Sequence, residues 1–383
     1  MRPPIGIDYT SAVRQTAGIG RYTRELLSAL LALDDGQQYL LFAAVGGLPA
    51  GRWPQERDRL LTLRPSLRFR TLPLSDDWMA RLWHRLRLPL PVELLTGRLA
   101  LFYSPDFVLP PTLPRTRTLL TVHDLSFIHY PDAFVPSLRR YLERVVPRSV
   151  ARADLVLADS AATRADLIAH FGTPSAKIEV LYSGVDRRFR PEPQPGERDR
   201  LKARYAIGDE PYILTVGTLQ PRKNYPLLIH AWAALADAPP LVIAGGKGWL
   251  YDEIFAAARR HGDRVRLIGF VDDADLPALY RHAALFAFPS LYEGFGLPVL
   301  EAMACGVPVV CADDSSLPEV AGEAARLVNP HDRAAWTAAL ARVLDDHSLR
   351  ERMIAAGLSQ AARFTWDRAA RQLRSAFDRC LNL

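Results

Sequence analysis

Short apolar runs alternate with helix-patterned segments along most of the chain, and this alternation constrains the fold more than any other feature. The first half is expected to form strands at residues 4–8, 38–44, 67–72, 99–103, 118–123, 154–158 and 178–182. In the second half, the runs YILTVG, LVIAGG, VRLIGFV and LFAFP are likewise separated by helical segments. Because parallel strands need crossover helices between them, the sequence predicts an α/β protein with doubly wound parallel sheets.

The length and composition indicate two globular domains. At 383 residues the chain exceeds the size of a single core. Residues 186–200 are rich in proline and charge and poor in aliphatic side chains, which is typical of a linker. We therefore expect an N-terminal domain over residues 1–185, a linker over 186–204 and a C-terminal domain over 205–364.

Cysteine usage and hydropathy predict a cytoplasmic protein. The cysteines Cys305, Cys311 and Cys380 are odd in number and lie in or beside apolar runs, as reduced core residues do. The N-terminus leads directly into strand-like sequence without a signal peptide, and no apolar run is long enough to span a membrane. The net charge of +6 lies entirely in residues 1–185, which hold 23 basic and 17 acidic side chains. Such a surface attracts nucleic acid, an anionic membrane or a phosphorylated substrate.

The segment EGFGLPVLE carries the most specific functional pattern. It follows the strand LFAFP, and its glycines at 294 and 296 allow a sharp turn before a helix that is expected to begin at Pro298. Free amides at a helix start bind anions, whereas Glu293 and Glu301 on either side accept hydrogen bonds from sugar hydroxyls. This layout suits a nucleotide sugar. The alternative is a capped helix with two solvated glutamates.

Three further groups of residues lie where a parallel sheet binds ligands, beyond the carboxyl ends of strands. Arg222 and Lys223 follow the strand 212–217, and two adjacent cations suit a diphosphate, although a solvated basic turn is the alternative. His123 ends the strand 118–123. Gly18 and Gly20 lie at the first strand-to-helix turn, where the backbone can approach a phosphate, or where they form a plain turn.

Two other segments have patterns that are found at functional sites. WMARLWHRLRLPLP, residues 78–91, has the tryptophans and arginines of a membrane-surface helix, and an amphipathic helix packed on the sheet is the alternative. DDAD, residues 272–275, contains an Asp-x-Asp pattern, but it precedes a helix that aspartates would cap. We therefore predict no metal site there.

Five motifs, taken in chain order, resemble those of the retaining glycosyltransferase family 4. They are TVHDLSF, TVGTLQPRKN, LVIAGGKG, IGFVDDADLPALYRHA and EGFGLPVLE. The resemblance runs from the first strand to the last helix and implies a GT-B fold, in which two Rossmann-like domains have the active site in the cleft between them. It also implies that a final helix, residues 365–383, packs back on the first domain.

The resemblance assigns roles to individual residues. It implies that Arg222 and Lys223 bind the donor diphosphate, that Glu301 contacts the ribose, and that Glu293 contacts the donor hexose. His123 resembles the cleft histidine that contacts the donor sugar, so we count His123, Glu293, Arg222 and Lys223 as catalytic. The remaining donor-binding positions are Gly18, Gly20, Gly269, Phe270, Val271, Gly294, Phe295, Gly296 and Leu297.

The expected function is transfer of a hexose from a nucleotide-diphosphate sugar to a glycan or lipid-linked acceptor, without a metal or other cofactor. The basic helix after His123 resembles bacterial mannosyltransferases of surface polysaccharide assembly, so GDP-mannose is the first candidate donor and a UDP-hexose such as UDP-glucose the second. Peripheral attachment to the inner face of the cell membrane stays open. The alternatives are a sugar-nucleotide epimerase or phosphorylase, and a basic nucleic-acid binder, which the lack of interleaved stacking aromatics disfavours.

Overall fold

The computed structural model describes residues 3–16, 18–33 and 36–383, and the chain divides into two compact units. The N-terminal unit comprises residues 1–125, 140–184 and 366–383, and the C-terminal unit comprises residues 126–139 and 185–365. Among the described residues no helix is both long and apolar enough to cross a bilayer.

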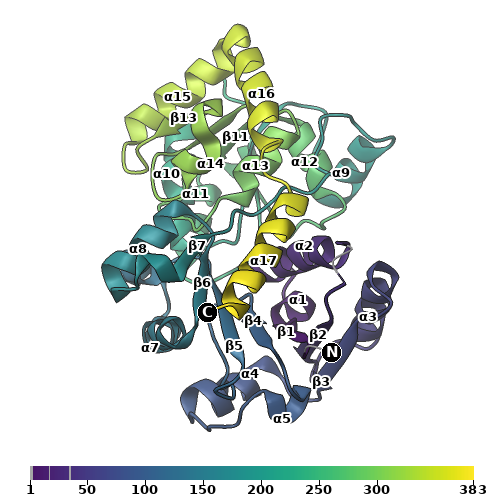
Figure 1. Cartoon of the computed structure of the whole chain (residues 1–383). Coiled ribbons are helices and arrows are strands. Elements are labelled where there is room, and N and C mark those ends of the chain that lie inside the picture. Colours follow the sequence, from purple (N-terminus) through teal and green to yellow (C-terminus); the bar gives the residue numbers. More distant parts are fainter. Residues whose placement is uncertain (1–2, 17, 34–35) are drawn as a thin grey trace. The chain divides into compact units, whose positions relative to one another are not determined.

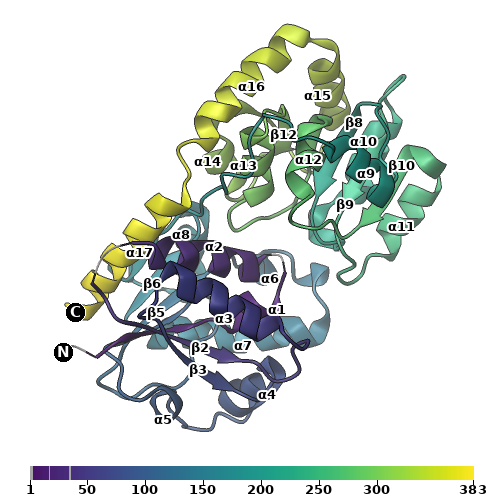
Figure 2. The same cartoon turned by 90° about the vertical axis from the view of Figure 1, so that its right-hand side faces the viewer.

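The N-terminal unit is built on a seven-stranded parallel sheet in the order β3-β2-β1-β4-β5-β6-β7, counted over the described residues. Its strands are β1 (Ile5–Asp8), β2 (Tyr39–Ala44), β3 (Arg68–Leu72), β4 (Leu101–Ser104), β5 (Arg117–Val122), β6 (Leu155–Ala158) and β7 (Ile178–Val180). Ile5 of β1 pairs with Tyr39 on one side and Leu101 on the other. Helices cover both faces (Figures 1 and 2), which is why every residue of β2, β4 and β6 is buried.

The helices of this unit come from three separate parts of the chain. They are α1 (Thr10–Arg14), α2 (Ile19–Leu31), α3 (Arg52–Leu63), α4 (Asp76–Met79), α5 (Glu93–Thr96), α7 (Pro136–Arg152) apart from residues 136–139, α8 (Ala161–Phe171) and α17 (Trp366–Leu381). The last of them, α17, packs against α2 and β5 (Figure 1), and its Phe377 is fully buried. The Phe377 ring lies 5.6 Å from that of Tyr103 and 6.3 Å from that of Tyr39. The chain therefore returns to the first sheet to complete its core.

The C-terminal unit is built on a six-stranded parallel sheet in the order β10-β9-β8-β11-β12-β13 within the described part of the chain. Its strands are β8 (Tyr212–Val216), β9 (Leu241–Ala244), β10 (Val265–Gly269), β11 (Ala283–Phe288), β12 (Val309–Ala312) and β13 (Ala325–Val328). Its helices are α6 (Ser126–His129), α9 (Glu197–Tyr205), α10 (Tyr225–Ala233), α11 (Asp252–Arg259), α12 (Leu276–Arg281), α13 (Leu297–Ala304), α14 (Leu317–Ala321), α15 (Arg333–Asp345) and α16 (His347–Ala361). The prediction of doubly wound parallel sheets is confirmed.

Both sheets have the same internal order, in which the strand sequence reverses direction once. The reversal lies between β1 and β4 in the N-terminal unit and between β8 and β11 in the C-terminal unit. Ligands of open α/β sheets bind outside the carboxyl ends of the strands at such a switch point. A ligand is therefore expected to bind at the loops that follow these four strands.

Two segments differ from the sequence-based expectation. Within the predicted linker, residues 197–204 belong to helix α9, which is tied to the C-terminal unit because Arg204 pairs with Asp272 and Asp275. Residues 78–91 are not one amphipathic helix: α4 ends at Met79, a π-helical turn spans Ala80–Arg85, and a loop without regular secondary structure follows.

Candidate functional site

The switch point of the C-terminal sheet brings three predicted residues together. Arg222 and Lys223 lie in a short 3-10 turn after β8, and Glu293 lies in the loop after β11. The two loops are joined by a hydrogen bond from the Leu291 amide to the Arg222 carbonyl, 2.9 Å long. Since β8 and β11 are neighbours in the sheet, their carboxyl-end loops necessarily meet.

These three side chains form a buried ionic cluster. Nζ of Lys223 lies 2.5 Å from Oε1 of Glu293, and Nη1 of Arg222 lies 3.1 Å from Oε2. Burial alone would raise the pKa of the Glu293 carboxyl, but the charges of Arg222 and Lys223 outweigh it and lower the pKa to about 2. The cluster thus holds two cations against one carboxylate and has an excess positive charge.

Serines that the sequence reasoning missed hold the Glu293 loop in place. Ser290 donates a hydrogen bond to the Glu293 carboxylate. From the loop after β12, Ser315 accepts a hydrogen bond from the Glu293 amide at 2.8 Å, and the Ser316 hydroxyl lies within 2.9 Å of the carbonyls of Glu293 and Phe295. Their only signal in the sequence is that they follow a strand of the same sheet, at its carboxyl end.

Helix α13 starts directly from this loop. Gly296 is its N-cap residue with φ +111°, and a Cβ there would lie 2.7 Å from Cδ2 of Leu317. Only glycine suits both the conformation and the space. The helix begins at Leu297, so Pro298 occupies its second position and not the first as predicted. Gly294 and Phe295 complete the turn, and Phe295 is buried against Phe364, with ring centroids 5.8 Å apart.

The contacts described here for Glu301 and for residues 269–271 are with residues outside the ionic cluster. Glu301 is buried on α13, and its carboxylate accepts a hydrogen bond from the Tyr280 hydroxyl at 2.9 Å. Gly269 ends β10 with φ +73°, Phe270 is about half exposed, and Val271 is buried. Because β10 is two strands away from β8, this segment is at the edge of the sheet, beyond the switch point.

The carboxyl edge of the N-terminal sheet has an acidic character. His123 follows β5, with Nδ1 2.6 Å from Oδ2 of Asp159 and Nε2 3.0 Å from the Pro105 carbonyl. Burial would lower the pKa of His123, but Asp159, and Asp106 further away, raise it to about 9. A carbonyl only accepts, so Nε2 donates to Pro105, while Nδ1 faces the Asp159 carboxyl group. Both ring nitrogens are thus engaged with protein atoms.

Two carboxyl groups and the two predicted glycines lie at the same edge of this sheet. Burial raises the pKa of Asp8, at the end of β1, to about 6, and that of Asp106, after β4, is also raised by burial. Gly18 is the N-cap of α2 with φ +57°. A Cβ on Gly20 would lie 2.3 Å from the Gln15 carbonyl oxygen, so the turn is closed to side chains there.

Two aspartates of the motif DDAD, residues 272–275, pair with Arg204 of helix α9. Asp275 occupies the N-cap position of α12 without a side-chain capping bond, which corrects the predicted role. Its carboxylate instead accepts hydrogen bonds from Arg204 and from the Tyr205 hydroxyl, the latter at 3.0 Å. The competing arginine and tyrosine contacts explain why the cap is not made.

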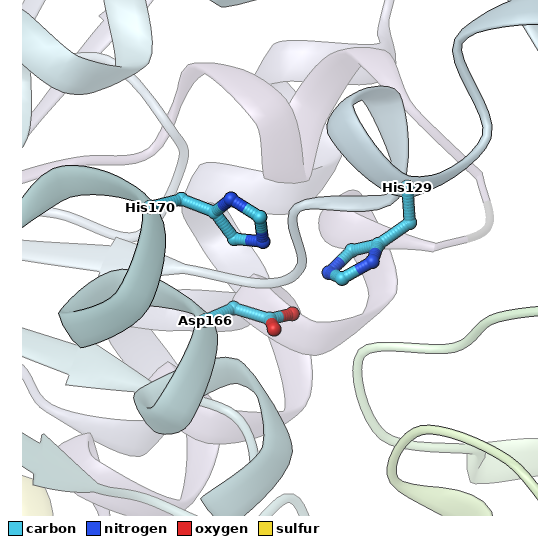
Figure 3. Close-up of side chains that lie close together, drawn as sticks. All are labelled: His129, Asp166 and His170. Carbon is cyan, nitrogen blue, oxygen red and sulfur yellow. The ribbon is translucent and has the colours of Figure 1, made fainter.

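Figure 3 shows potential metal-ligating side chains outside this motif. Asp166 and His170 lie one turn apart on α8 of the N-terminal unit, whereas His129 belongs to the C-terminal unit. Neither unit by itself therefore assembles three such ligands from this group.

Comparison with known proteins decides the family. The model of Glycosyltransferase Family 4 matches residues 16–189, and that of Glycosyl transferases group 1 matches residues 197–360. The chain is 37% identical over 284 residues to O-antigen chain mannosyltransferase B from Escherichia coli, covering 72% of this chain and 74% of that protein. The chain belongs to glycosyltransferase family 4.

Solved structures agree with this assignment at the level of the fold. Sucrose-phosphate synthase from Thermosynechococcus elongatus superposes with a TM-score of 0.76 at 22% identity, covering 99% of each chain. Anabaena HepE, solved in complex with UDP and glucose, gives a TM-score of 0.72 at 19% identity, covering 98% of this chain and all of the other. The GT-B fold predicted for this family-4 glycosyltransferase is confirmed.

Proposed function

We propose that this family-4 glycosyltransferase moves mannose from GDP-mannose to a glycan acceptor, free or carried on a lipid, with retention of anomeric configuration. A UDP-hexose is the second candidate donor. The observation that carries the proposal is the buried cluster of Arg222, Lys223 and Glu293 at the switch point of the C-terminal sheet. The similarity to an O-antigen mannosyltransferase supports mannose as the sugar.

In this proposal the donor diphosphate binds against the excess positive charge of the cluster. Arg222 offers a planar fork to two oxygens and Lys223 a point charge, and each charge-assisted hydrogen bond contributes about 1.5–3 kcal/mol. Amides at the start of α13 face the same loop. The proposed roles of Glu293 and Glu301 are to accept hydrogen bonds from hydroxyls of the hexose and the ribose, and that of residues 269–271 is to contact the base.

The proposed chemistry is a same-face substitution. The bond between the anomeric carbon and the diphosphate oxygen breaks, and Arg222 and Lys223 stabilise the negative charge that develops on the departing phosphate. The acceptor hydroxyl attacks from the side of the leaving group and gives its proton to the phosphate. Glu293 is held by two cations, which argues against a nucleophilic role. His123 is held by Asp159 through Nδ1, which argues against general-base catalysis, and its proposed sugar contact replaces the bond from Nε2 to the Pro105 carbonyl.

The test combines ligand binding with product analysis. Thermal-shift titrations with GDP, GDP-mannose, UDP and UDP-glucose identify the base, and transfer from the stabilising donor to a mannan oligosaccharide is followed by NMR of the new anomeric proton. We expect stabilisation by GDP ligands and an α-linked product, with activity retained in EDTA. Lys223→Ala should lose the stabilisation by the donor. Arg260→Ala, which removes an exposed basic side chain at the end of α11, is its matched control. Stabilisation by none of these nucleotides would contradict the proposal.

A further inference from the structure

The N-terminal unit concentrates exposed apolar side chains in one part of its sequence. Of the eleven large hydrophobic residues exposed in the described part of the chain, six lie between residues 78 and 113. Leu86 is 66% exposed and Leu94 is 69% exposed, which are the two highest values among them. The others are Trp78, Leu90, Leu95 and Leu113. Single exposed leucines are ordinary, but a group of this kind marks a binding surface.

Buried anchors hold this segment so that its leucines face outward. Met79 and Trp83 are buried, and the Trp83 indole donates a hydrogen bond to the Leu90 carbonyl at 2.9 Å. Trp83 is therefore part of the core and is not available for an external contact. The Glu93 carboxylate is also buried and accepts a hydrogen bond from the Leu113 amide at 3.1 Å, which brings Leu113 beside α5.

The same segment carries positive charge on its outer side. The exposed charged residues between 78 and 98 are Arg81, Arg85, Arg87 and Arg98, whereas Glu93, the one acidic residue there, is turned inward. Arg115 is exposed next to Leu113. Asp76 and Asp77 precede the segment, and Asp76 pairs with Arg14 at 3.2 Å. Both views show α4, where the segment begins, and α5, near its end, on the same side of the N-terminal sheet (Figures 1 and 2).

We propose that residues 78–98, together with Leu113 and Arg115, form a surface that binds an anionic lipid bilayer. Exposed leucines enter the boundary between headgroups and acyl chains while arginines contact lipid phosphates, the combination expected of a peripheral membrane contact. Charge complementarity selects this occupant, because an apolar protein partner would have to desolvate five arginines. The inference goes beyond sugar transfer and does not depend on the identity of the donor or acceptor.

The experiment is flotation of the full chain with vesicles of phosphatidylcholine, with and without phosphatidylglycerol. We expect the protein to float only with the anionic vesicles and to dissociate at high salt. The triple variant Leu86→Ser/Leu90→Ser/Leu94→Ser should stay at the bottom of the gradient. Arg85→Gln/Arg87→Gln/Arg98→Gln should bind about a hundredfold more weakly, since each arginine near an anionic surface contributes about fivefold.

Matched controls lie on the same unit. Leu63→Ser/Ile168→Ser changes exposed apolar residues elsewhere, and Arg57→Gln/Arg68→Gln/Arg70→Gln removes three exposed arginines from α3 and β3. Both should float like the unmodified protein, and thermal melting verifies that every variant is folded. The proposal is overturned if the unmodified protein does not float, if the controls lose binding as strongly, or if sedimentation reveals a dimer that the leucine substitutions dissociate.

Discussion

Lys223 and Glu293 form an ion pair of 2.5 Å in which both side chains are about nine-tenths buried. The pair occupies the position where the proposed donor diphosphate binds, so an anionic ligand has to share Lys223 with a carboxylate already in place. Removing either partner should therefore change nucleotide binding in opposite directions.

Glu293→Gln should bind the nucleoside diphosphate at least as tightly as the unmodified protein and yet lose more than about a hundredfold in transfer rate. The substitution removes a negative charge beside the phosphates and weakens the proposed hexose contact. Lys223→Ala should weaken nucleotide binding by about tenfold or more, the worth of one charge-assisted hydrogen bond. Isothermal titration and initial-rate assays measure both quantities. Equal loss of nucleotide affinity in the two variants would falsify this view of the cluster.

Acid should destabilise the C-terminal unit through Glu293. The pKa of this carboxyl is about 2 in the folded protein against an ordinary value of 4.5, so its contribution is complete above pH 4.5 and is lost as the pH falls toward 2. The shift corresponds to about 3 kcal/mol. The check is urea unfolding of the unmodified protein and Glu293→Gln across this range. The two stability curves should converge on acidification, and parallel curves would count against the assignment.

Asp159→Asn should abolish the elevated pKa of His123. With the carboxylate present, the pKa is about 9, so its stabilising contribution is complete below the ordinary value of 6.5 and disappears as the pH rises through 9. Without it, burial still lowers the pKa and only Asp106 and the Pro105 carbonyl raise it, so the pKa falls well below 9. NMR titration of the imidazole Cε1 proton measures this, with the exposed Asp58→Asn on α3 as control. A titration near pH 9 in Asp159→Asn contradicts the ion-pair explanation.

Gly296→Ala should destabilise the donor loop. The new Cβ would meet Leu317 at 2.7 Å, and φ of +111° is unfavourable for alanine, so a loss of about 1–3 kcal/mol is expected together with weaker nucleotide binding. Gly246→Ala is the control, because no atom lies within 4 Å of a Cβ built there. Thermal melting and nucleotide titration compare the two. Equal losses of stability and of nucleotide affinity in both variants would contradict the strain expected at Gly296.

Local patterns predicted the sheets because strand and helix periods are properties of short segments. The meeting of Arg222 and Lys223 with Glu293 followed from the same logic, since carboxyl-end loops of adjacent strands converge. Their roles in donor binding stay predictions. Ser315, Ser316 and Asp159 escaped attention because single serines and aspartates are common in loops, and only three-dimensional proximity distinguishes them.

Tertiary contacts overrode local preference in two places. The segment after α4 widens into a π-helical turn around the buried Trp83, whose indole donates a hydrogen bond to the Leu90 carbonyl beyond the end of that turn. Asp275 has the sequence position of a helix cap, but Arg200 and Arg204 from α9 take its carboxylate. Neither competition is visible in the isolated segments.

The return of α17 to the first sheet has a consequence for biosynthesis. Strands β1 to β7 leave the ribosome long before residues 366–381, yet the aromatic neighbours of Phe377 on β2 and β4 remain uncovered until that helix emerges. The half of the protein that is translated first thus cannot complete its core until residues 366–381 have been made.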